Sequence, residues 1–255
     1  AMRKGLATGD NGRFLRWWFE VSMSKIGLHC SSRSEATKSG MKWFPHNKGG
    51  DARKWHGNFD YVINWENDGH AIQHFFDENG KLRSRPQNLE YSFKQALTWS
   101  KITSGPFTAR YCEGGCLFDD AAAIGHSSDR KQLLRILQIL NSKVGQCVLQ
   151  TLNPSVNLQI GDISRTPIIE LSSEEERTHL DLNAENCIHL ARADWNSFET
   201  SWDFTDHPFH GPAQQNTTLE ACWLNWQARC NAAIRRMQEL ETENNRLFIA
   251  AYGLE

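Results

Sequence analysis

The chain has 255 residues, of which 39% are hydrophobic and 23% are charged, as in an ordinary globular protein. This length buries enough surface to fold without a disulfide or a metal ion. No apolar run is as long as a membrane span, which needs about 18 residues. No secretory signal is visible either, so we expect no membrane partner. Seven scattered cysteines, an odd number, favour reduced thiols and a cytoplasmic protein.

The formal net charge of −2 conceals an uneven distribution of charge along the chain. Residues 1–110 hold 17 Lys and Arg against 10 Asp and Glu, whereas residues 111–255 hold 11 against 20. A basic first part indicates a polyanion as partner. The alternative is surface charge that clusters without a function.

Residues 1–125 are rich in glycine and turns, with short strand-like pieces between them. Residues 61–65 (YVINW) have the aromatic and β-branched content of a strand. In residues 107–118, apolar residues alternate on both sides of the turn Glu113-Gly114-Gly115, which predicts a β-hairpin.

Residues 129–150 are predicted to form one helix, because apolar residues recur at its period. Asn153-Pro154 ends this helix, and a strand-like segment, NLQIGDI, follows. Residues 170–215 are acidic and predicted to be turn-like. The stripe of the predicted helix consists of Leu133, Leu137, Leu140, Val144 and Val148.

Residues 217–250 are predicted to form a long helix that starts with a capping box of Thr217 and Glu220. Its apolar residues recur at alternating steps of three and four, which is a heptad seam. The partner of the seam is either a second helix or the chain's own domain. The seam consists of Trp223, Trp226, Cys230, Ala233, Met237, Leu240, Asn244 and Leu247.

The chain lacks the common catalytic motifs: a G-x-G-x-x-G turn, a P-loop, a G-x-S-x-G elbow and H-E-x-x-H. Asn153-Pro154-Ser155 lacks the second proline and the aromatic residue of an amino-methyltransferase loop. We therefore assign no methyl-transfer chemistry to these residues and expect no cofactor in this chain.

The sequence also offers residues for two kinds of metal site. Cys112 and Cys116 with His126 contain too few paired ligands for zinc. Asp119-Asp120 and the glutamates of 174–176 could serve a metal-dependent nuclease. Buried thiols and surface carboxylates explain both patterns more simply, so no metal is predicted.

Basic and amide side chains crowd three short stretches of the first half. Arg and Lys neutralise phosphates, and Arg, Asn and Gln can pair with the edges of guanine or adenine. If loops bring these side chains to one face, they would suit duplex DNA. The candidate contacts are Arg13, Arg16, Lys42, Asn47, Lys48, Arg53, Lys54, Arg83, Arg85 and Gln87.

Several segments together resemble one family, the BREX adenine-specific DNA methyltransferases (PglX family). GLATGDNGRFLR (5–16) resembles the opening of their target-recognition domain. The remaining matching segments follow in order along the chain: KWFPHNKGGDARKWHGN (42–58), YVINWENDG (61–69), LRSRPQNLEYSFKQALTWSKI (82–102), FTARYCEGGCLFD (107–119), the stretch 133–168, DWNSFETSWDF (194–204) and NNRLFIAAYGLE at the end.

The resemblance implies an α/β (α+β) target-recognition domain with a twisted mixed sheet, followed by a long helical arm. We expect residues 1–170 to form this domain, 171–215 an acidic connection and 216–255 the arm. The implied partners are double-stranded DNA and the catalytic domain of the same parent chain, which would hold S-adenosylmethionine. Other subunits of a phage-defence system are further candidates, and so is a role as a protein–protein interaction module.

Overall fold

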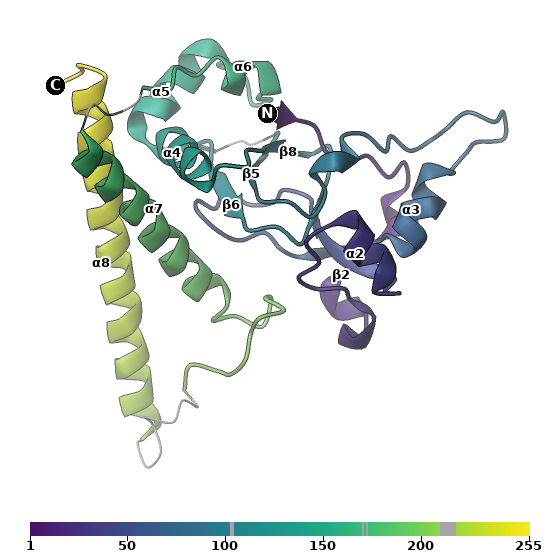
Figure 1. Cartoon of the computed structure of the whole chain (residues 1–255). Coiled ribbons are helices and arrows are strands. Elements are labelled where there is room, and N and C mark those ends of the chain that lie inside the picture. Colours follow the sequence, from purple (N-terminus) through teal and green to yellow (C-terminus); the bar gives the residue numbers. More distant parts are fainter. Residues whose placement is uncertain (103–104, 170, 172, 210–217) are drawn as a thin grey trace.

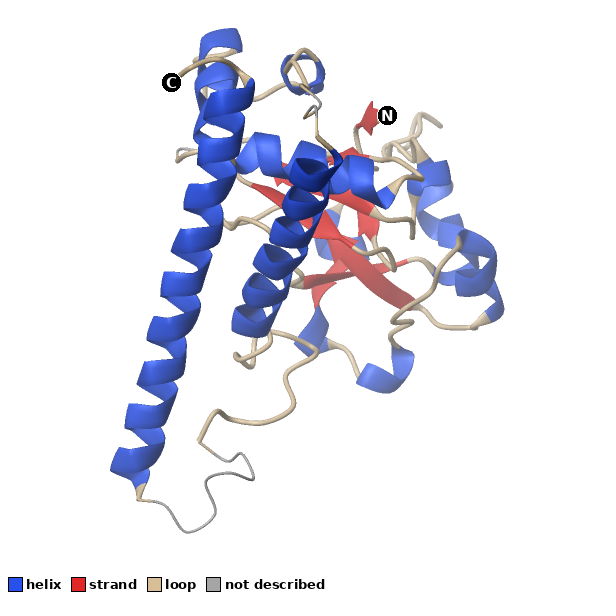
Figure 2. Cartoon of the chain, turned by 60° about the vertical axis from the view of Figure 1, so that its left-hand side comes forward, coloured by secondary structure: helices blue, strands red, loops and turns tan. Residues whose placement is uncertain are grey.

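A computed structural model describes residues 1–102, 105–169, 171, 173–209 and 218–255. Its strands form the centre of the molecule, and the larger helices cover one flank of them (Figures 1 and 2). The predicted α/β class is confirmed, including the long helix near the carboxyl end. None of the described helices is long and apolar enough to cross a membrane.

The described strands make two four-stranded sheets rather than the single sheet predicted. In the first sheet, all neighbours are antiparallel; in order it contains β1 (Met2–Arg3), β8 (Ala122–Gly125), β5 (Ala96–Ser100) and β6 (Ala109–Cys112). The second sheet is mixed, because β3 and β7 run parallel; in order it contains β2 (Leu15–Trp17), β4 (Tyr61–Asn64), β3 (Trp43–Asn47) and β7 (Leu117–Phe118).

The strand predicted at 61–65 is confirmed as β4, but the hairpin predicted at 107–118 is wrong. Its two halves, β6 and β7, belong to different sheets. Gly114 adopts φ +120°, and a Cβ there would lie 2.7 Å from the carbonyl oxygen of Phe93. Residues 113–116 therefore carry the chain from one sheet to the other, a role that alternation alone cannot distinguish from a hairpin turn.

The helix predicted at 129–150 is two helices, α4 (Arg130–Asn141) and α5 (Lys143–Leu152). Ser142 ends the first and caps the second: its hydroxyl donates to Ile139 O and accepts from Gly145 N at 3.0 Å. The apolar stripe is real, but it continues across a bend. The segment NLQIGDI, predicted as a strand, instead ends in the short helix α6 (Ile160–Ser164).

The acidic segment predicted to be turn-like contains α7 (Glu174–Trp195). The hydroxyl of Ser173 caps the first turn by accepting from Glu176 N at 3.0 Å. Carboxylates at 174–176 are favourable there because the helix dipole is positive at that end. The prediction of a turn is wrong, because the acidic residues 174–176 form the first turn of a helix. The buried face of α7 joins the main core beside α4 and α8.

The long helix is confirmed as α8 (Leu219–Ala251). Thr218 is the N-cap of this helix, because its hydroxyl accepts from Ala221 N. The predicted cap Thr217 lies outside the described residues. Leu240 and Leu247 are buried, so the second half of the heptad seam packs on the chain's own domain. The first half projects beyond α7 (Figure 2).

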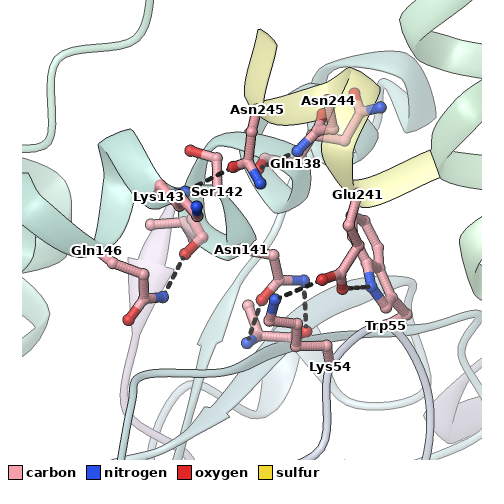
Figure 3. A network of polar contacts seen from close by, with 12 residues as sticks. Lys54, Trp55, Gln138, Asn141, Ser142, Lys143, Gln146, Glu241, Asn244 and Asn245 are labelled. Atoms are coloured by element: carbon pink, nitrogen blue, oxygen red, sulfur yellow. Dashed lines mark hydrogen bonds and ion pairs between the residues drawn. The ribbon is translucent and has the colours of Figure 1, made fainter. Parts of the chain in front are cut away.

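A polar network fastens the second half of α8 to the rest of the molecule (Figure 3). Asn244 is buried and donates to Gln138 O at 3.1 Å. The carboxylate of Glu241 accepts from the Trp55 indole at 2.8 Å and from the Lys54 ammonium at 2.9 Å. These contacts join α8 to α4 and to the loop that precedes β4.

The remaining short helices lie mostly around the second sheet. They are α1 (Asn11–Phe14), α2 (Arg33–Lys38), α3 (Glu66–Gln73) and the 3-10 turns Trp18–Glu20, Met23–Lys25 and Leu89–Tyr91. Their apolar residues share a second core with the sheet, separate from the core under α4 and α7. Apart from β7, the second sheet and these helices come from the basic first part of the chain, residues 1–110.

Candidate nucleic-acid interface

Residues 8–11, Thr-Gly-Asp-Asn, form a tight turn that organises the candidate surface. The Thr8 hydroxyl donates to Asn11 Oδ1 at 2.6 Å, and the Asp10 carboxylate caps α1 by accepting from Arg13 N at 3.0 Å. Gly9 has φ +76°, and a Cβ there would lie 2.7 Å from Arg83 O. Only glycine therefore allows this turn to pack against residues 83–85.

Two arginines from distant parts of the sequence converge beside this turn. The Cζ atoms of Arg13 and Arg83 lie 5.0 Å and 4.8 Å from the centre of the Phe75 ring. Phe75 is itself buried against Phe14, with the ring centres 5.2 Å apart. The ring contacts both guanidinium groups, while the two arginines stay exposed. Arg85 adjoins them through backbone pairing with Ala7.

A cleft of about 660 Å³ opens next to the turn. Lys48 and Lys101 supply cations to its lining, and the Thr-Gly-Asp-Asn turn supplies another part of it. The lining mixes hydrogen-bond donors and acceptors, as a polar ligand requires. Its other polar side chains are Ser100, Asp119 and Asp120.

Under the cleft, His46 Nε2 lies 3.1 Å from Asp119 Oδ2, and Ala121 N donates to Asp119 Oδ1 at 2.8 Å. Burial alone would raise the pKa of Asp119, but the contact with His46 and the Ala121 amide outweigh it and lower this pKa. Asp119 is thus held as a structural anion. In contrast, the buried Asp120 Oδ1 has no hydrogen-bond partner among the described residues.

A buried arginine lies behind Ser100, one of the residues that line the cleft. Arg110, on β6, is fully buried, and burial lowers its pKa to about 10. It donates to Arg53 O at 3.3 Å and lies 3.5 Å from Ser100 Oγ. No ion pair between described residues involves Arg110. Its charge therefore adds to the positive potential behind Ser100 and the loop after β3.

Four of the ten predicted contact residues lie around this turn: Arg13, Lys48, Arg83 and Arg85. Two others lie on neighbouring parts of the second sheet. Arg16 turns back to donate to Gly12 O at 2.7 Å, with its guanidinium over Trp43. Lys42 is exposed, with Glu66 3.8 Å away.

The other four predicted contacts are engaged within the fold. Asn47 is fully buried and accepts from the Thr98 hydroxyl at 2.9 Å, so it is withdrawn as a DNA contact. Lys54 pairs with Glu241 under α8. Arg53 lies 3.3 Å from the Asp194 carboxylate, and Gln87 donates to Gly5 O at 2.9 Å. The middle cluster at 42–55 therefore does not converge on one surface.

The contact residues predicted from the sequence do not include Lys101, Ser100 or the buried Arg110. Lys48 follows β3 in the second sheet, whereas Ser100 and Lys101 lie at the end of β5 in the first. Their proximity depends on how the two sheets pack. No spacing in the sequence could have indicated it.

The zinc alternative does not assemble. His126 Nδ1 lies 2.7 Å from Gln95 O, whereas Cys112 and Cys116 are buried together. A hydrogen bond between their thiols lowers the pKa of Cys112 and raises that of Cys116. Within the described part of the chain, no group of three His, Cys, Asp or Glu side chains could hold a metal ion.

Comparisons with known proteins support one relationship. No protein-family model matches the chain. It is 39% identical to the adenine-specific methyltransferase PglX of Lacticaseibacillus casei (strain Zhang) over 258 residues, which cover 99% of this chain and 21% of that protein. It is 35% identical to the adenine-specific methyltransferase BrxX of Escherichia coli O9:H4 (strain HS), over 79% of this chain and 15% of that protein.

A solved structure shares the fold. The type IIL restriction-modification enzyme MmeI, solved in complex with DNA, aligns over 100% of this chain and 33% of its own, with a TM-score of 0.58 and 11% identity. The chain spans only about a fifth of the length of PglX. The chain is therefore a homologue of one segment of the PglX and BrxX adenine-specific methyltransferases.

Proposed function

We propose that the chain is the DNA target-recognition module of an S-adenosylmethionine-dependent N6-adenine DNA methyltransferase in a BREX phage-defence system. The observation that carries the proposal is the convergence of Arg13, Arg83, Arg85 and Lys48 around one turn. The names of the relatives support it, and so does the fold shared with an enzyme solved on DNA. The cofactor and the catalytic groups would belong to another domain of the parent protein.

In this proposal, the guanidinium groups beside Phe75 enter a DNA groove or bind its phosphates. Each exposes a planar fork of N–H donors that fits guanine O6 and N7 or a phosphate. Stacking on Phe75 limits the rotamers of both side chains, so less entropy is lost on binding. Lys48 and Lys101 would add unspecific attraction to the backbone.

The test removes charge at the turn. Arg13→Gln and Arg83→Gln should each weaken binding to duplex DNA in a gel-shift titration at several salt concentrations. Each lost phosphate contact lowers the salt slope by roughly 0.9. Arg246→Gln is the matched control, because Arg246 is exposed on α8 and pairs there with Glu243. Unchanged affinity and slope in both test variants would refute the proposal.

A protein–protein interaction module is the second candidate. It is favoured by the first half of α8, where Trp223, Leu224 and Ile234 are exposed. If this half binds other defence subunits, Ile234→Ser should abolish their co-purification and leave DNA binding intact. Co-purification that survives in both Ile234→Ser and Leu224→Ser would exclude this role.

A further inference from the structure

An exposed column of aromatic rings lies along the edge strand β2. The Trp17 and Tyr61 rings stack with their centres 4.4 Å apart and their planes 28° apart. Phe19 continues the stack at 5.9 Å from Trp17, with an interplanar angle of 15°. Trp17 is 42% exposed and Phe19 is 63% exposed. The outer end of the column therefore presents aromatic surface to solvent.

The fold holds this column in place. Trp17 is opposite Tyr61 in the β2–β4 pairing, and its backbone N–H donates to the Glu20 carboxylate at 2.8 Å. The Trp18 indole donates to Thr200 O at 2.9 Å, and the Phe19 ring stands edge-on to Trp18. Ordered rings left in water forgo the favourable free energy of burial, which indicates that a ligand covers them.

The inner end of the column carries a positive charge. The Lys48 ammonium lies 4.8 Å from the centre of the Tyr61 ring, and Lys48 also lines the cleft beside the Thr-Gly-Asp-Asn turn. The column is thus continuous, through Lys48, with the cleft beside that turn. Stacked aromatic faces next to a cation fit a nucleobase and its phosphate, because every base has a π face of this size.

We propose that the Phe19 end of the column, backed by Trp17, stacks on an unpaired or unstacked base of the DNA that this surface binds. The inference rests on the proposed function and adds to it a local distortion of the duplex. An aromatic wedge between base steps kinks the helix and lets more protein surface contact it. The expected ligand is therefore a nucleotide that has left the regular stack.

The test uses the whole chain and two duplexes. One is fully paired, and the other has the same sequence with one extra, bulged 2-aminopurine in one strand. Wild-type protein should bind the bulged duplex more tightly than the paired one. Its binding should also quench the fluorescence of the bulged 2-aminopurine relative to the free duplex. Trp17→Ala and Phe19→Ala should each reduce that preference about fivefold or more, the usual contribution of one base–aromatic stack. Both should keep the wild-type affinity for the paired duplex to within a few fold.

Trp223→Ala is the matched control, because Trp223 on α8 is 47% exposed and belongs to another aromatic cluster. It should leave both the preference and the quenching unchanged. Equal binding of the two duplexes by wild-type protein, or a preference that survives in Trp17→Ala and Phe19→Ala, would overturn the inference while DNA binding stands. No binding to either duplex would refute the proposed function itself. A partner protein captured through the column, with the bulge ignored, would also overturn the inference.

Discussion

His56 shows how one half-buried side chain contributes to the acid stability of the fold. Burial, reinforced by the charges of Arg192 and Arg53, lowers its pKa from 6.5 to about 3. The folded chain therefore keeps His56 neutral, whereas the unfolded chain protonates it below 6.5. Because the unfolded state then binds more protons, stability is lost as the pH falls through 6.5 and toward 3.

The free energy of unfolding should thus decline by about 1.4 kcal/mol per pH unit from this group alone, well below pH 6.5. Replacing His56 with Gln, which does not titrate, should flatten the decline between pH 6 and pH 5. Urea titrations at both pH values measure it. His207→Gln serves as the control, since His207 lies in the loop after α7. Equal slopes in wild type and His56→Gln would contradict the lowered pKa.

At this same scale, residue types in the sequence predicted which side chains can bind DNA, but not which are free to do so. Arg13 and Arg53 are chemically equivalent in the sequence. In the structure, one projects beside Phe75 and the other pairs with Asp194 on α7. The acidic partner is 141 residues away. Only the tertiary packing decides which arginine is engaged.

At the scale of elements, the contacts of Glu241 predict how strongly α8 is held to the rest of the fold. Glu241 accepts from the buried Trp55 indole, and Glu241→Leu would leave that N–H without a partner, which costs about 1–3 kcal/mol. Glu241→Gln keeps an acceptor of the same shape and should lose less. Thermal and urea unfolding of the two variants measure the difference. Equal losses would show that the Lys54 charge, rather than the indole hydrogen bond, anchors the helix.

Helical periodicity predicted the elements more reliably than alternation did. The stripes in 129–150 and 217–250 mark real helices because a buried stripe is needed wherever these helices pack. The bend at Ser142 was missed because its hydroxyl caps from within the stripe. The hairpin prediction at 107–118 was wrong because a crossover between sheets has the same glycine turn as a hairpin.

At the scale of the whole molecule, the family resemblance indicated an α/β fold, and the heptad pattern placed a long helix at its end. Residues 1–170 were expected to form the domain, with α8 as a separate arm. In the structure, Leu240 of α8 is buried in the same core as Trp99 of β5 and Leu137 of α4. Sequence periodicity gives a helix its apolar face but does not say what covers it.

This shared core predicts that α8 and the first sheet unfold together. Leu240→Ala should destabilise the chain by about 2–5 kcal/mol, because it leaves a cavity in the core. Ile234→Ala, six residues earlier on the same helix, should change stability by less than about 0.5 kcal/mol, since Ile234 is 55% exposed. Native-state hydrogen exchange separates two outcomes. If the core is one unit, Leu240→Ala accelerates exchange in β5 and β6 as much as in the second half of α8. If exchange rises in α8 alone, the helix is an independent arm that unfolds separately from the domain, as the predicted boundary at residue 216 implies.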